Sequence, residues 1–108
     1  MKYLTGRFSL HMLDGEQKLA LIQVRNIEPK DVPEDVESRF GHENMAAIVG
    51  NILGRKLQCN KQSVMLEEGD TLYVALHKGA FIPSWATRLP VGATISFVEI
   101  TLQPTNGG

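Results

Sequence analysis

The stretch GHENMAAIVGNILG, residues 41–54, decides the fold class because it places a helix in a sequence otherwise rich in strand patterns. Its apolar side chains recur at i, i+3, i+4, i+7 and i+8, the spacing of one helical stripe. They are Met45, Ile48, Val49, Ile52 and Leu53. Gly54 follows directly and supplies the usual C-terminal stop. We therefore predict one amphipathic helix that ends at Gly54.

Strand patterns lie on both sides of this helix. Three stretches have the length and the apolar, β-branched content of strands: KYLTG (2–6), KLALIQVRN (18–26) and TISFVEITL (94–102). In the second stretch, apolar residues occupy both alternating sides, which predicts a strand covered on both faces. A helix among strands predicts the α/β class, here a small α+β domain.

Two further stretches predict a β-hairpin. KQSVML (61–66) and TLYVAL (71–76) are separated by EEGD, which is a turn sequence. Residues 72–76 are almost continuously apolar, so this strand is predicted to be central in the sheet.

The remaining segments predict loops. IEPKDVPEDVESRF (27–40) carries two prolines and a run of acids, which suits a loop with one short helical turn. RFSLHML (7–13) predicts a single helical turn with Phe8 and Met12 on one face. HKGAFIPSWATRLPVGA (77–93) predicts a long loop, and loops of that length are usually functional.

Length and composition predict one globular domain. The chain has 108 residues, 43% hydrophobic and 21% charged, which is typical of a single domain. The last predicted strand ends at residue 102, so we place the domain at residues 1–102 and a flexible tail, QPTNGG, at 103–108. The net charge of −1 disfavours a duplex-DNA binder, which normally carries a basic excess. The single Cys59, a predicted buried thiol, suits a reducing compartment. No apolar run has the length of a membrane span and residues 1–13 lack a signal-peptide pattern, so we predict a cytoplasmic protein without a membrane partner.

The chemistry-bearing residues are few. His11, His42 and His77 are far apart in the sequence and there is no second cysteine, so neither a metal nor another cofactor is predicted. His42 stands where the helix begins, beside backbone N–H groups that are unpaired and carry the positive end of the helix dipole. A phosphate bound there would lie within proton-transfer reach of the imidazole. The alternative is that His42 only caps the helix.

Five motifs in order extend this interpretation: YLTGRFSLHML, FGHENMAAIVGNILG, NKQSVML, EEGDTLYVAL and RLPVGA. Together they resemble a small viral and bacterial family that includes the ring-nuclease anti-CRISPR proteins of type III systems. The resemblance covers residues 3–102. It implies a homodimer with a central mixed sheet flanked by helices, and a pocket for cyclic tetra-adenylate across the two-fold axis. It also implies metal-free cleavage, in which a ribose 2′-hydroxyl attacks the adjacent phosphate and His42 protonates the departing 5′-oxygen.

The resemblance assigns the ligand-binding residues as well. In the opening motif Thr5, Phe8, Ser9, Met12 and Leu13 match the family, whereas Gly6, Arg7 and His11 replace asparagine, alanine and asparagine. Lys61 replaces an arginine, which keeps the charge but loses the bidentate geometry. The implied ligand contacts are Gly6, Arg7, Phe8, Ser9, Met45, Lys61 and Arg88.

The last motif departs from the family. RLPVG carries Val91 where the family has a carboxylate, and KGAFIP (78–83) is a second candidate for the place of the arginine-containing loop. Three functions therefore stay open: a ring nuclease, a protein that binds the same ring without cleaving it, and a structural or DNA-associated viral protein. Trp85 is either a base-stacking residue or a packing residue.

Overall fold

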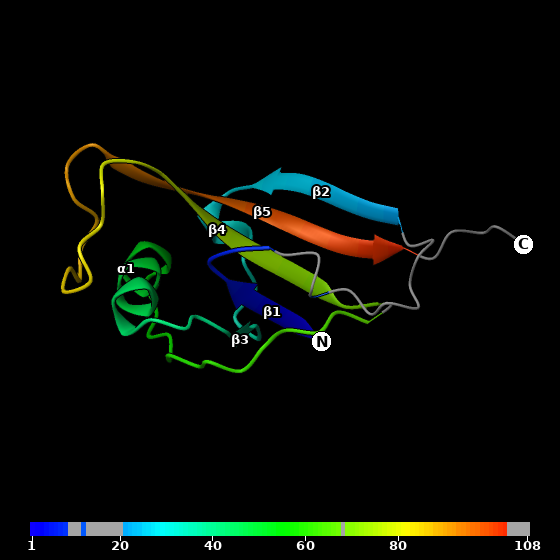
Figure 1. The fold of residues 1–108 in the computed structure, drawn as a ribbon. Coiled ribbons are helices and arrows are strands. Elements are labelled where there is room, and N and C mark those ends of the chain that lie inside the picture. Colours follow the sequence, from blue (N-terminus) through cyan, green and yellow to red (C-terminus); the bar gives the residue numbers. More distant parts are fainter. Residues whose placement is uncertain (9–11, 13–20, 68, 104–108) are drawn as a thin grey trace, which may run out of the picture.

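The computed structural model describes residues 1–8, 12, 21–67 and 69–103, in which five strands form one mixed sheet and one α-helix packs against it. The α+β fold predicted from the sequence is confirmed. The elements are β1 (Lys2–Thr5), β2 (Leu21–Ile27), the 3-10 turn η2 (Pro29–Asp31), β3 (Glu37–Ser38), α1 (Glu43–Leu53), β4 (Thr71–Gly79) and β5 (Ala93–Gln103). Figure 1 shows the sheet as a twisted layer with α1 near one end.

β4 is the middle strand of the sheet, whose order is β2-β5-β4-β1-β3. It pairs in parallel with β1, from Lys2 opposite Thr71, and antiparallel with β5. The side chains of Leu72 and Val74 are fully buried. The predicted central position of this apolar run is therefore confirmed.

The predicted hairpin of residues 61–66 with 71–76 is wrong. Both edges of β4 are taken, one by β1 and one by β5, so no edge is left for residues 61–66. Val64 and Leu66 instead pack their side chains into a core cluster on one face of the sheet. The turn itself forms, because Asp70 accepts a hydrogen bond from the backbone N–H of Glu67 at 2.9 Å. The hairpin partner of β4 is β5, across residues 80–92.

β2 is an edge strand, and the prediction that it is covered on both faces is wrong. Ile22 and Val24 are exposed, Val24 by 62%. Apolar residues on both sides of a strand predict burial only where neighbouring elements reach it, and β2 pairs with β5 alone. Residues 18–20 of the predicted strand lie outside the described residues.

α1 confirms the predicted helix. Gly54 ends it in the left-handed conformation, at a φ of 70°, which a glycine adopts without strain. Its apolar side covers one face of the sheet, where it completes a core cluster whose buried members are Leu4, Val32, Phe40, Ala46, Val49, Tyr73, Ala75 and Phe97. On the opposite face, Phe8 and Met12 pack against the cluster that contains Val64 and Leu66.

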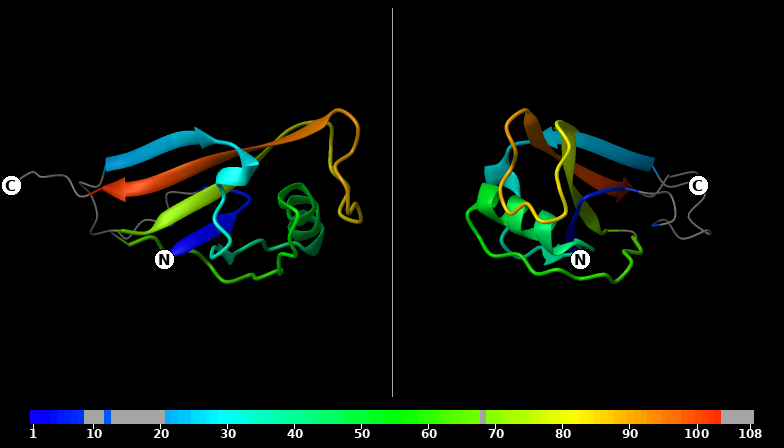
Figure 2. Two further views of the ribbon diagram at one scale, coloured as in Figure 1. Left: turned by 180° about the vertical axis from the view of Figure 1, so that it is seen from behind. Right: turned by 60° about the vertical axis from the view of Figure 1, so that its left-hand side comes forward.

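The loop of residues 80–92 joins β4 to β5 and projects past the end of the sheet beside α1 (Figures 1 and 2). It replaces the predicted loop of residues 77–93, because β4 continues to Gly79. The predicted helical turn between residues 27 and 40 is η2. β5 includes Gln103, one residue beyond the predicted domain boundary, and residues 104–108 are outside the description. No helix in the described part of the chain is long and apolar enough to cross a membrane.

Candidate functional site

His42 is the N-cap residue of α1, and its side chain makes no capping hydrogen bond. Its backbone is extended, and its carbonyl oxygen accepts the first helical hydrogen bond from Ala46 at 3.2 Å. The imidazole is exposed to solvent. The alternative that the His42 side chain serves the helix as a cap therefore has no support in this geometry, and the ring is free to contact a ligand.

A first hollow of about 340 Å³ opens beside His42. It lies between the residues that follow β1 and the start of α1. Its walls are formed by Thr5, Gly6, Arg7, Arg39, Phe40, Gly41, His42 and Met45. Four of the predicted site residues, from two distant parts of the sequence, thus meet in one place: Gly6, Arg7, His42 and Met45. The first hollow combines two cationic side chains with the positive end of a helix, an arrangement that suits an anion.

Arg39 belongs to this wall, although the sequence analysis did not identify it. Its guanidinium pairs with Glu37, donates to Gln62 Oε1 at 3.1 Å and lies 5.2 Å from the ring centre of Tyr3. Its Nε is buried and has no hydrogen-bond partner among the described residues. Burial raises the pKa of Tyr3, and the positive charge of Arg39 partly opposes that rise. No motif marks Arg39; only its place two residues before the glycine of the GH pair hinted at the site.

A second hollow of about 380 Å³ also borders His42. Its walls come from α1, the end of β4 and the loop that follows: His42, Asn44, Met45, His77, Phe81, Ile82 and Ser84. His42 and Met45 line both hollows.

The loop of residues 80–92 is fixed against α1 by two side-chain amides. Asn44 donates to the carbonyl oxygen of Pro83 at 3.2 Å, and Asn51 donates to that of Thr87 at 2.9 Å. Figure 2 shows the loop alongside the helix in both views. These bonds hold residues 81–84 against the first turn of α1.

The other predicted site residues lie elsewhere. Phe8 is half-buried against the core, and Lys61 and Arg88 are exposed and line neither the first nor the second hollow. Val91 is 100% exposed. Ser9 and His11 lie outside the described residues. The residues of the loop 80–92 that line a hollow with His42 are Phe81, Ile82 and Ser84.

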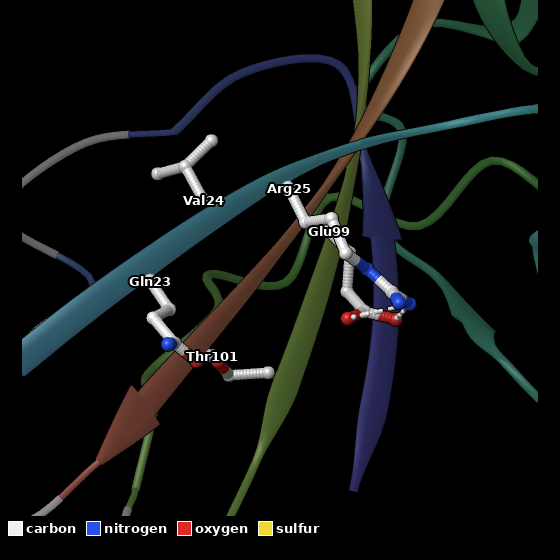
Figure 3. Close-up of a pocket in the computed structure, with 5 residues that line it drawn as sticks. All are labelled: Gln23, Val24, Arg25, Glu99 and Thr101. Atoms are coloured by element: carbon white, nitrogen blue, oxygen red, sulfur yellow. Dashed lines mark hydrogen bonds and ion pairs between the residues drawn. The ribbon is translucent and has the colours of Figure 1, made fainter.

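A third hollow, of about 380 Å³, lies across β2 and β5 and is lined by Gln23, Val24, Arg25, Glu99 and Thr101 (Figure 3). Arg25 there pairs with Glu99 at 3.1 Å, and Glu99 also accepts a hydrogen bond from the Tyr73 hydroxyl at 3.2 Å. Burial, reinforced by the charge of Glu99, raises the pKa of Tyr73. Glu99 places a carboxylate in the wall of the third hollow, whereas none of the residues that line the first hollow is acidic. The third hollow therefore suits an anion less well than the first.

We also searched the described part of the chain for a reactive thiol and for a metal site. Cys59 is half-buried, pairs through its backbone with Phe40 and is a free thiol. Among the residues that the structure describes, no three histidine, cysteine, aspartate or glutamate side chains gather closely enough to hold a metal ion.

Comparison with known proteins finds a similar fold in a solved structure. No protein-family model matches the sequence, and no curated protein sequence matches it. Among solved structures, the chain is similar to B116 of Sulfolobus turreted icosahedral virus (STIV), with a TM-score of 0.71 and 19% sequence identity. The similarity covers 93% of this chain and 97% of the viral protein. At that identity the likeness concerns the fold, so this sequence adopts a small α/β fold that a viral protein also has.

Proposed function

We propose that the protein binds a cyclic oligoadenylate in the first hollow and opens the ring without a metal ion. The observation that carries the proposal is the meeting of His42, Arg7 and Arg39 around the N-terminus of α1. An anionic phosphate is favoured there by the helix dipole and by the unpaired N–H groups of the first turn. The resemblance to ring nucleases adds the chemical class of the ligand.

In the proposed reaction the ligand supplies its own nucleophile. The ribose 2′-oxygen bonds to the adjacent phosphorus while the bond from phosphorus to the 5′-oxygen breaks. His42 donates a proton to the departing 5′-oxygen, and the 2′-hydroxyl proton passes to solvent. The products are a 2′,3′-cyclic phosphate and a free 5′-hydroxyl. The exposed, uncapped imidazole is accessible for this role as a general acid.

The proposal includes a homodimer in the cytoplasm. One subunit offers a single His42 and a single first hollow, whereas a ring of four nucleotides carries four phosphates. A two-fold dimer would present two equivalent first hollows to a ligand with matching symmetry.

The test is chromatography of cyclic tetra-adenylate after incubation with the purified protein and a chelator. We expect linear products that end in a 2′,3′-cyclic phosphate. If intact ring is recovered together with the protein, the protein binds the ring but does not cleave it. Absence of both cleavage and retention would refute the proposal.

Sequestration of the ring without cleavage is the second candidate function. It is favoured by the loop beside His42, where Phe81, Ile82 and Ser84 supply neither an arginine nor a carboxylate. Val91 also replaces the carboxylate of the family motif, and its side chain is fully exposed. Single-turnover measurement at excess protein separates the two functions, since it detects even slow cleavage.

A further inference from the structure

Phe81 is one of two aromatic side chains that the anchored loop of residues 80–92 holds in solvent; the other, Trp85, does not line the second hollow. The Phe81 side chain is 82% exposed, although it lies only two residues from Pro83, whose carbonyl is bonded to Asn44. The loop is closed at its base by the hydrogen bond from Ala80 to Gly92, at 2.9 Å. Exposure of a large apolar ring on a fixed loop carries a solvation cost that a ligand would relieve.

The second hollow, which Phe81 lines, has the composition of a small-molecule site. Met45, Phe81 and Ile82 supply apolar walls, while Asn44 and His77 supply polar groups. It is an open hollow of about 380 Å³.

The polar groups of this hollow present hydrogen-bond acceptors. One N–H of the Asn44 side-chain amide donates to Pro83, and the carbonyl oxygen of that amide has no donor among the described residues. His77 Nε2 lies 2.7 Å from the carbonyl oxygen of Ala80, which requires Nε2 to donate. In the neutral ring Nδ1 is then the acceptor. Two acceptors in an aromatic-walled hollow match a base with an exocyclic amine.

We infer that the second hollow is a nucleobase subsite, in which Phe81 stacks on an adenine and Asn44 and His77 accept from its exocyclic amine. His42 and Met45 line both hollows, so one nucleotide would place its phosphate in the first hollow and its base in the second. The inference rests on the proposed function, because this base belongs to the ligand whose phosphate lies beside His42.

The experiment uses adenosine 5′-monophosphate, inosine 5′-monophosphate and ribose 5-phosphate as probes, titrated into the protein and followed by NMR. The adenine nucleotide should bind more tightly than the other two, because inosine lacks the amine and ribose 5-phosphate lacks the base. Phe81→Ala should weaken adenosine 5′-monophosphate binding by roughly 5- to 140-fold, the equivalent of one stacking contact. Phe81→Tyr keeps the ring and should restore binding.

Val91→Ala is the matched control, because it trims an exposed apolar side chain on the same loop outside both hollows. Equal binding of all three probes, no binding of any, or an unchanged affinity in Phe81→Ala would overturn the base subsite. Ring opening is assayed separately with cyclic tetra-adenylate. If the protein cleaves cyclic tetra-adenylate but does not prefer the adenine nucleotide, only the base subsite is refuted. If it binds the adenine nucleotide selectively but does not bind the ring, only the proposed function is refuted.

Discussion

Asn44, in the first turn of α1, donates a hydrogen bond to the carbonyl oxygen of Pro83 at 3.2 Å and so ties the helix to the loop of residues 80–92. The residue lies two positions after His42, and Pro83 lies two positions after Phe81. Together with the Asn51 amide, which donates to Thr87, this amide sets the position of the loop relative to the histidine. The width of the second hollow depends on this contact.

Asn44→Ala should loosen the loop without unfolding the domain. Loss of the hydrogen bond costs about 1 kcal/mol, while alanine is the better helix former, so global stability should change little. Opening of residues 80–92 should become roughly fivefold more frequent, since that factor corresponds to about 1 kcal/mol. Hydrogen exchange of the loop amides measures it. Asn51→Ala removes the second anchor, at Thr87, and should act in the same direction. Unchanged exchange in the double variant would show that other contacts hold the loop.

Gly50→Ala should destabilise the protein. A Cβ at this buried helical position would lie 2.5 Å from the backbone oxygen of Arg55, which belongs to the chain that leaves the helix. The clash costs about 1–3 kcal/mol and outweighs the gain of about 1 kcal/mol in helix propensity. Urea unfolding measures the change. Gly41→Ala is the control, because a Cβ there meets nothing within 4 Å. Wild-type stability of Gly50→Ala would contradict the close approach.

The helix and the site could be predicted from the sequence to different degrees. α1 was predicted because its stripe from Met45 to Leu53 and its stop at Gly54 are local. The hairpin partner of β4 was not, since the turn at Asp70 is local while the pairing of β4 with β1 joins distant parts of the chain. The exposure of Val24 likewise depends on which elements reach the edge of the sheet.

Prediction of the site had the same limit. His42 stood out through its place at a helix start, and Gly6, Arg7 and Met45 followed from the resemblance. Arg39 was not identified because no motif marks it and only the fold brings it into the wall of the first hollow, beside Tyr3. Asn44, His77 and Phe81 were also missed as a group, since only the folded loop brings them to one hollow.

The stability of the protein should fall as the pH rises above about 10, in part through Tyr73. Burial and the neighbouring Glu99 raise the pKa of this phenol above its usual value of 10.0. In that window the folded protein retains a proton that the unfolded chain has lost, so folding weakens with increasing pH. Tyr73→Phe should therefore show a shallower loss of unfolding free energy between pH 9 and pH 11. Tyr3, whose pKa is also raised, contributes equally to both proteins and cancels in the comparison. Parallel pH profiles would contradict this role for Tyr73.

Salt should weaken binding of the ring, and Arg7 should account for part of that dependence. Arg7 is exposed and lines the first hollow, so its attraction to a phosphate is screened by added ions. Arg7→Ala should lower the affinity for cyclic tetra-adenylate more at low salt than at high salt. Titration at two ionic strengths measures both effects.

Three matched variants locate the cations that matter. Lys30→Ala removes an exposed charge from η2, away from both hollows, and should leave the affinity unchanged. Lys61→Ala and Arg88→Ala test the two cations implied by the resemblance, which line neither hollow in one subunit. If either of them matters as much as Arg7, the ligand extends beyond the first hollow. If Arg7→Ala and Lys30→Ala lower the affinity for cyclic tetra-adenylate equally, the first hollow is not the phosphate site.

His42→Ala should abolish most of the cleavage and leave the fold intact. A positioned general acid contributes roughly 10²–10⁴-fold in rate, so single-turnover opening of cyclic tetra-adenylate should slow by that factor. Because the imidazole is exposed and makes no capping hydrogen bond, the free energy of unfolding should change by no more than about 0.5 kcal/mol. Ring affinity should stay close to that of the wild type, since the N–H groups of α1 and the two arginines remain. A loss of stability with no selective loss of rate would make His42 a structural residue. If folded His42→Ala cleaves the ring at the wild-type rate, another group donates the proton and the first hollow is a binding site only.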